Sequence, residues 1–230
     1  MPIIPLHDGL ALTHIHRPYA GWTLIAINVL VYFVVERGGL STVSEASVLS
    51  YGLIPAVFND YVDLPAGYAV VPDWLTIVTY SFLHGNLWHL IGNMVFLWVF
   101  GDNVEDAFGH VRFVLFYVLC AIGAGYAFVV VDPASQVPVI GASGAGAGIV
   151  AAYLMLHPNQ KVWVLAFARI PLRIGAGWVL GFWVLFQVYS VLVAQPNDQV
   201  AWWSHIGGLI SGALLVLVLR RRGVPLFDRA

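Results

Sequence analysis

The sequence predicts an all-α membrane protein with six transmembrane helices and a long first external loop. Of its 230 residues, 60% are hydrophobic and 10% are charged, whereas about a quarter of a soluble domain is charged. The mean hydropathy is +0.84, which excludes a disordered chain. A formal net charge of −2 also excludes a nucleic-acid-binding protein that relies on a basic face.

Six apolar segments are long enough to cross about 30 Å of hydrocarbon, which takes roughly 20 residues, or fewer where protein surrounds the end of a helix. We expect spans near Trp22–Val35, His84–Phe100, Arg112–Val131, Ser143–Leu156, Gly175–Val193 and His205–Leu219. Turn-forming residues separate them at 36–39, 101–103, 132–133, 157–159 and 195–198. Residues 1–20 are expected to be a cytoplasmic N-terminal tail, 21–220 the six-helix domain and 221–230 a basic cytoplasmic tail.

The basic residues give the expected orientation, because loops rich in Lys and Arg stay in the cytoplasm. With the N-terminus inside, nine of the ten Lys and Arg lie on the cytoplasmic side, and only Arg37 lies outside. Both termini are therefore expected in the cytoplasm. The N-terminal residues lack the features of a secretory signal or an organelle presequence. We expect a bacterial inner membrane, with an archaeal membrane as the alternative.

The first external connector, residues 38–83, is long for a six-span protein. It contains the segment Tyr51–Phe58, which is too apolar for water and too short to span a membrane. A plain surface loop is one interpretation. We favour a structure that is partly embedded in the outer leaflet, as amphipathic interfacial segments are.

Four polar residues fall inside the predicted spans, where each costs on the order of 2–3 kcal/mol. They are His89, Asn93, Ser143 and His205. The second, fourth and sixth spans all run from outside to inside, and these residues lie in the first half of each. They are therefore expected to share one layer of the membrane.

The fourth and sixth helices are expected to begin below the outer surface. Ser143–Leu156 is about 21 Å long and His205–Leu219 about 22 Å, at about 1.5 Å per residue. Irregular backbone at that depth is tolerated only inside protein or beside water. The sequence thus predicts an aqueous cavity that opens to the outside.

Small residues allow the fourth and sixth helices to approach closely. They recur every four residues, at Gly144 and Gly148 and at Gly208 and Gly212. His205 shares the glycine face of its helix, and Ser143 adjoins the first glycine of the other. A hydroxyl and an imidazole are thus expected to meet within about 2.6–3.2 Å, as a nucleophile and its base must.

The second span adds hydrogen-bond donors. His89 and Asn93 are four residues apart and lie on one helix face. Together with the backbone N–H of Ser143 at a helix N-terminus, they are expected to surround the negative oxygen that forms when a hydroxyl attacks an amide carbonyl.

Other site types fit the residues less well. His84, His89 and His205 suggest a metal site, but H-E-x-x-H is absent and no carboxylate is expected in the hydrocarbon layer, so no metal is predicted. An aspartyl protease needs two buried aspartates, and the candidate aspartates fall in connectors. A lone serine or a glycine face usually has only a structural role, so the conjunction at one depth carries the prediction. A transporter is a further alternative, although no inverted repeat is evident.

Three ordered motifs resemble those of the rhomboid intramembrane serine proteases. The second span reads H-G-N-L-W-H-L-I-G-N-M from His84, similar to H-x-x-x-x-H-x-x-x-N. The fourth opens with G-A-S-G from Gly141, similar to G-x-S-G. The sixth reads S-H-I-G-G-L-I-S-G from Ser204, similar to A-H-x-x-G-x-x-x-G. The similarity extends over essentially the whole chain.

The resemblance implies a six-helix rhomboid core that cleaves single-pass transmembrane proteins in or near their membrane helix, within the lipid bilayer and without a cofactor. It implies Ser143 as the nucleophile and His205 as the general base and acid. His89, Asn93 and Gly141 would stabilise the oxyanion. His84 is implied to hold the external connector, and the fifth helix with the connector after Gln195 to control the approach of substrate.

The sequence departs from the family pattern near the predicted base. Some members have an aromatic residue four positions after the serine, thought to stack on the histidine, and here that residue is Ala147. No carboxylate is predicted near His205 either, so a third triad member is missing and slow turnover is expected. The alternative function is a non-catalytic rhomboid-like protein that binds membrane clients.

Overall fold

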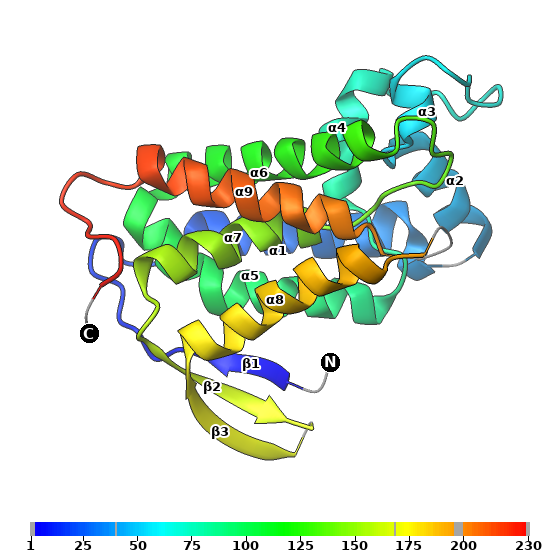
Figure 1. The fold of residues 1–230 in the computed structure, drawn as a ribbon. Coiled ribbons are helices and arrows are strands. Elements are labelled where there is room, and N and C mark those ends of the chain that lie inside the picture. Colours follow the sequence, from blue (N-terminus) through cyan, green and yellow to red (C-terminus); the bar gives the residue numbers. More distant parts are fainter. Residues whose placement is uncertain (1–2, 40, 168, 196–199, 229–230) are drawn as a thin grey trace.

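The structure is a computed structural model and describes residues 3–39, 41–167, 169–195 and 200–228. Figure 1 shows long helices that run roughly side by side, with the short helices of the first connector at one end and the C-terminal segment at the other. The long helical segments are α1 (Tyr19–Leu30) with the π-helical turn η1 (Val31–Val35), α5 (Leu87–Phe108), α6 (His110–Val131), α7 (Ser143–Leu156), α8 (Ala176–Val193) and α9 (Trp202–Leu219). The chain is mostly helical, as predicted.

The composition of the helices indicates a membrane protein. Among the described helices, α6, α8 and α9 are long and apolar enough to cross a membrane. Tyr19–Val35 and α7 are apolar but shorter. Helix α7 is the central helix, because it contacts α5, α6, α8 and α9 and most of its side chains are buried. Protein rather than lipid therefore surrounds it, so a length of about 21 Å is sufficient there.

Helix α5 extends beyond its predicted end. We expected a connector at residues 101–103, but the helix continues to Phe108. Tertiary hydrogen bonds stabilise the extension: the Asn103 side chain donates to Asp8 at 2.6 Å, and Asp106 accepts from backbone N–H groups of the N-terminal segment, including those of His14 at 2.7 Å and Ile15 at 2.8 Å. These partners, about 90 residues away along the chain, override the turn-forming tendency of Gly-Asp-Asn.

Helix α9 begins three residues earlier than predicted, at Trp202. Its 18 residues give a length of about 27 Å, so the expectation of a short sixth helix was wrong. His205 consequently lies in the first turn of α9 and not at its first residue.

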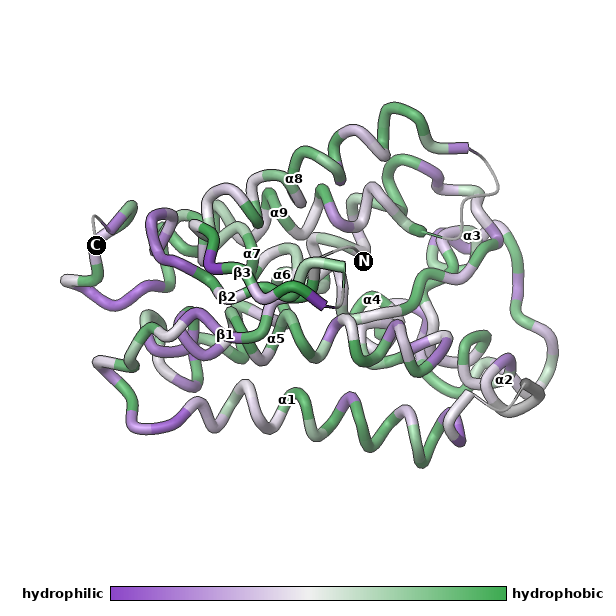
Figure 2. The backbone as a smooth tube through the Cα atoms, turned by 90° about the horizontal axis from the view of Figure 1, so that it is seen from below, coloured by the Kyte–Doolittle hydropathy of each residue, from purple (hydrophilic) through white to green (hydrophobic). Residues whose placement is uncertain are grey.

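A three-stranded antiparallel sheet was not predicted. It has the order β1-β2-β3 and consists of β1 (Ile3–His7), β2 (Lys161–Ala166) and β3 (Ile170–Gly175). Strand β1 contacts α5 and strand β3 contacts α8. Figure 2, which views the molecule from below, shows the sheet between these two helices. The sheet therefore bridges α5 and α8, and an all-α description is incomplete.

The first external connector is helical in part. It contains α2 (Ser41–Tyr51), α3 (Pro55–Phe58), α4 (Thr76–Thr79) and the 3₁₀ turns η2 (Arg37–Gly39), η3 (Asp73–Leu75) and η4 (Tyr80–Phe82). Within the apolar segment at residues 51–58, Leu53 is fully buried and packs with Tyr80 and Val139. Protein contacts thus account for part of its apolar character, and embedding of the connector in the outer leaflet stays a prediction.

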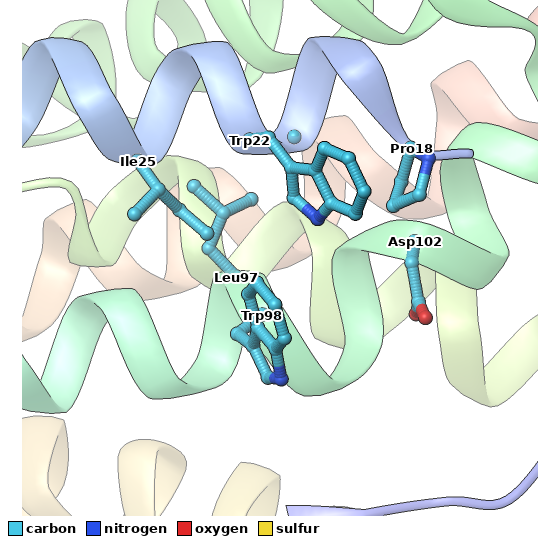
Figure 3. Close-up of a pocket in the computed structure, with 7 residues that line it drawn as sticks. Pro18, Trp22, Ile25, Leu97, Trp98 and Asp102 are labelled. Carbon is cyan, nitrogen blue, oxygen red and sulfur yellow. The ribbon is translucent and has the colours of Figure 1, made fainter.

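A small hollow of about 160 Å³ lies between α1 and α5 (Figure 3). The ring of Trp22 stacks on that of Trp98, with centroids 6.5 Å apart. The other labelled side chains there are Pro18, Ile25, Leu97 and Asp102. None of the predicted site residues lines this hollow.

Candidate active site

A larger cavity of about 680 Å³ lies among α5, α7, α8 and α9. It is walled mainly by apolar and aromatic side chains. Five of the predicted site residues line it: Ser143, His205, His89, Asn93 and Gly141. The structure thus brings together predicted residues from three helices and one loop.

Ser143 is the first residue of α7. The loop before it makes a tight turn at Gly141, whose φ is +117°, a value that a residue with a side chain rarely adopts. The N–H of Gly141 donates to the carbonyl oxygen of Tyr80 at 3.0 Å. This turn anchors the start of α7, so that Ser143 faces the cavity.

His205 lies on α9 and is buried. Its Nε2 is 2.9 Å from Ser143 Oγ. Two indole rings flank the imidazole: that of Trp202, in an edge contact with centroids 5.9 Å apart, and that of Trp183, tilted at 6.2 Å. In this arrangement an unprotonated Nε2 is able to accept the hydroxyl proton.

Glycines allow the two helices to come this close. A Cβ atom added to Gly208 would lie 2.0 Å from the carbonyl oxygen of Gly144, and one added to Gly212 would lie 2.2 Å from that of Gly148. Both distances are far shorter than a van der Waals contact. Any side chain at either position would therefore push α9 away from α7 and separate the hydroxyl from the imidazole.

His89 and Asn93 line the cavity from α5. A Cβ on Gly141 would lie 2.7 Å from the His89 ring and 3.7 Å from Asn93 Nδ2, so the Gly141 backbone packs directly against both side chains. Among the described residues, the buried Asn93 Nδ2 has no hydrogen-bond acceptor. A buried N–H group without an acceptor is costly, and here it lies beside the oxygen-binding region that the sequence predicts.

His84 lies outside the cavity and is fully buried. Its ring makes an edge contact with that of His89, with centroids 5.2 Å apart. Its backbone N–H donates to both carboxylate oxygens of Glu36, at 3.0 and 3.2 Å. Burial raises the pKa of Glu36 to about 7. The sequence interpretation did not identify Glu36, which links the end of the first helix to the segment before α5.

Gln187 on α8 is a second residue that the sequence interpretation missed. Its Oε1 lies 2.8 Å from His205 Nδ1. An amide inside an otherwise apolar span is unusual. The criterion that selected Asn93 would also have selected Gln187.

Two further predictions concern a metal site and the connector after Gln195. Within the described ranges, no group of three or more His, Cys, Asp or Glu side chains is arranged to hold a metal ion. The connector after Gln195, expected to control the approach of substrate, includes residues 196–199, which lie outside the described residues.

Comparison with known proteins identifies the family. The family model for the Rhomboid domain matches residues 71–222, a segment that includes α5 to α9. The chain is 29% identical to the rhomboid protease GluP of Bacillus subtilis over 91% of this chain and 36% of that protein. It is 37% identical to the chloroplastic Rhomboid-like protein 11 of Arabidopsis thaliana over 65% of this chain and 54% of that protein.

A third relative is the mitochondrial Rhomboid protein 1 of Saccharomyces cerevisiae, at 32% identity over 63% of this chain and 41% of that protein. The chain spans between about a third and two thirds of the length of such curated relatives. The Rhomboid domain match covers well over half of the chain and contains the serine, the histidine and the helices that hold them. This chain is therefore an integral membrane protein of the rhomboid family.

Proposed function

We propose that this chain is an intramembrane serine endopeptidase that cleaves single-pass transmembrane proteins in or near their membrane helix. Ser143 is the nucleophile and His205 is the general base and acid. The observation that carries the proposal is the 2.9 Å separation of Ser143 Oγ from His205 Nε2 at the wall of a cavity between helices. A base at that distance is within reach of the proton it must remove.

The reaction proceeds in two steps. Ser143 Oγ attacks the carbonyl carbon of the substrate peptide bond while His205 takes the hydroxyl proton. The tetrahedral intermediate then expels the amine, which receives that proton from His205, and an acyl-enzyme remains. Water attacks the ester with His205 again as the base, which releases a carboxylic acid product and regenerates the hydroxyl.

The negative oxygen of each tetrahedral intermediate is stabilised by donors around Gly141. These are the Asn93 amide, the His89 ring and the backbone N–H of Ser143 at the start of α7. The unpaired Nδ2 of Asn93 and the packing of Gly141 against both side chains support this assignment. The role of His84 is to hold the external connector: its backbone N–H donates to Glu36, and its buried ring packs against the ring of His89.

Substrate reaches the cavity between α5 and α8. Trp88 and Phe96 of α5 and Phe182 and Phe186 of α8 line the cavity, which suits an apolar segment. A helical substrate must unwind locally, because its peptide bonds are shielded by their own hydrogen bonds. Residues of low helix propensity near the cleaved bond are therefore favoured.

The topology that suits this function has six spans with both termini in the cytoplasm, in a bacterial inner membrane. The long helical segments α1 with η1, α5, α6, α7, α8 and α9 supply the spans. Cys120 is buried, so cysteines introduced at the exposed positions Glu45 and Arg222 are well suited to topology labelling. An impermeant maleimide should modify only the first in intact cells, and labelling of only the second would reverse the topology.

Labelling with a fluorophosphonate tests the catalytic assignment on detergent-purified protein. The wild type should react, and Ser143→Ala and His205→Ala should not. Ser50→Ala, which alters a buried serine outside the cavity, should react like the wild type. Persistent labelling of Ser143→Ala would remove the proposed nucleophile. Replacement of His89 or Asn93 alone should slow cleavage by about 10²–10³-fold, if each donates to the oxyanion.

Fluorophosphonate labelling, together with a cleavage assay in liposomes, separates the protease from the alternative, a rhomboid-like protein that binds membrane clients without cleaving them. Such a protein would bind a single-pass substrate in liposomes without releasing fragments and would leave the fluorophosphonate unreacted. The close pairing of Ser143 with His205 favours cleavage.

A further inference from the structure

Gln187 is a polar residue at a buried position of α8. It lies among apolar residues and is 2% exposed. The buried residues of α8 are Ala176, Leu180, Gln187 and Ser190. A buried amide must find hydrogen-bond partners for both its oxygen and its nitrogen, or it destabilises the fold. The contacts of Gln187 therefore indicate why an amide is present at this point.

The hydrogen bonds of Gln187 determine which way its amide points. Nε2 donates to the backbone carbonyl oxygen of Trp183, one turn earlier in α8, at 3.1 Å. If the amide were rotated by 180°, its oxygen would face that carbonyl oxygen and two acceptors would be opposed. Oε1 must therefore be the atom that faces His205 Nδ1, at 2.8 Å.

The amide orientation in turn determines the tautomer of His205. Oε1 carries no proton, so Nδ1 must donate the hydrogen bond. A neutral imidazole has one N–H group, which leaves Nε2 unprotonated. This is the nitrogen that lies 2.9 Å from Ser143 Oγ, so the hydroxyl donates to it. The two indole rings beside the imidazole restrict its plane, but they do not distinguish between its nitrogens.

We propose that Gln187 is a positioning residue that holds His205 in the catalytically competent tautomer and orientation. The inference rests on the proposed Ser143–His205 chemistry. Gln187 takes the place that an acidic residue has in a Ser-His-Asp triad, as a neutral amide. Within the described part of the chain, no carboxylate hydrogen-bonds to His205. The Gln187 contact can support the imidazole in place of the aromatic residue that the resemblance leads one to expect four positions after the serine. In this chain that residue is Ala147, which is fully buried.

Gln187→Met and Gln187→Glu are the variants that test this role. Methionine keeps the length and volume of the side chain but removes the amide acceptor, whereas glutamate keeps an acceptor oxygen. Ser190→Ala is the matched control, because Ser190 is also buried on α8, one turn further along. His89 and Tyr80, the other titratable groups at the cavity wall beside His205, are unchanged in all three variants.

Enforcing the wrong tautomer in a triad lowers kcat by about 10⁴-fold, and removing the acceptor frees both tautomers, so Gln187→Met should lower kcat and the labelling rate by roughly 10–100-fold. KM should stay near the wild-type value. Gln187→Glu keeps the acceptor for His205 Nδ1 but sets a second oxygen against the Trp183 carbonyl oxygen, so its rate should lie between those of Gln187→Met and the wild type. The acid limb of its pH profile should move to higher pH, because a carboxylate favours the imidazolium. Ser190→Ala should match the wild type in both respects.

The ¹⁵N shifts of the neutral His205 ring provide a readout that does not depend on activity. They should show Nδ1 protonated in the wild type and a mixture of tautomers in Gln187→Met. Wild-type rates or an unchanged tautomer in a folded Gln187→Met would overturn the inference. If Gln187→Met does not fold, an unmoved acid limb in Gln187→Glu would overturn it instead. An unreactive wild type with Nδ1 protonated would refute the proposed function and leave the positioning contact intact.

Discussion

Gly141 illustrates how one residue combines two requirements of the site. Its φ of +117° allows the turn before α7, and its missing side chain leaves room for the ring of His89. The first requirement concerns the backbone and the second concerns packing. Two substitutions separate these requirements, because Gly67 also has a positive φ but has no close neighbour.

Gly141→Ala should reduce the labelling of Ser143 by at least about 10-fold, since losing an oxyanion donor, the role proposed for His89, costs about 10²–10³-fold. The added methyl group would lie 2.7 Å from His89 and displace it. Gly67→Ala is the control, because Gly67 has a φ of +96° and nothing within 4 Å of its added Cβ. Gly67→Ala should lose some thermal stability but keep its labelling rate. Equal rates for both variants would show that the packing at Gly141 is unimportant.

At the scale of single residues, the polar side chains inside the spans were the predictable part of the site. His89, Asn93, Ser143 and His205 were selected because polar side chains are costly in a span, and the structure gathers them at one cavity. Gln187 meets the same criterion, but it belongs to none of the three sequence motifs and was therefore not predicted. Its partner, His205, is on another helix, and the sequence does not reveal that contact.

At the scale of elements, the contact between α7 and α9 holds the two halves of the proposed dyad together. Its glycines were predictable from their four-residue spacing, which has a direct physical meaning at a helix crossing. The sheet was not predictable in the same way. Strand β1 pairs with β2, which lies more than 150 residues later, and such long-range pairing leaves no local signal. The extension of α5 depends on similarly distant partners.

Gly208→Ala should destabilise the protein by about 3 kcal/mol or more, the upper end of the range for overpacked cores. The new methyl group would lie 2.0 Å from a backbone oxygen of Gly144, which cannot move without displacing α7. Thermal unfolding in detergent provides the measurement. Gly146→Ala is the control, because a Cβ there has nothing within 4 Å, and it should unfold at or above the wild-type temperature. A wild-type transition for Gly208→Ala would contradict the packing account.

At the scale of the whole molecule, tertiary contacts connect its distant segments. The N-terminal segment binds the end of α5 through Asp106, which accepts from Thr13, His14 and Ile15. Near the start of α5, Glu36 accepts from the backbone of His84. Hydropathy predicted the helices, but these polar links depend on three-dimensional proximity and remained hidden in the sequence.

The link at Glu36 should make stability depend on pH. Its pKa is raised from an ordinary value of 4.5 to about 7, so the folded protein keeps a proton that the unfolded chain releases between these values. Its contribution to stability therefore decreases as pH rises from about 4.5 to 7. Thermal unfolding at pH 5 and pH 8 should show a smaller difference for Glu36→Gln than for the wild type. Glu45→Gln, at an exposed position, should retain the wild-type difference.

Helix α8 is joined directly to the sheet at its first residue, and Gln187 lies eleven residues further on. That separation is about 16 Å along the helix, so pivoting α8 by about 10° at its sheet end would carry the amide about 3 Å sideways. A displacement of this size breaks a 2.8 Å hydrogen bond. If the proposed function holds, a pivot of α8 that admits substrate would therefore separate Gln187 from His205, so that substrate entry and proton transfer by His205 would take place at different times.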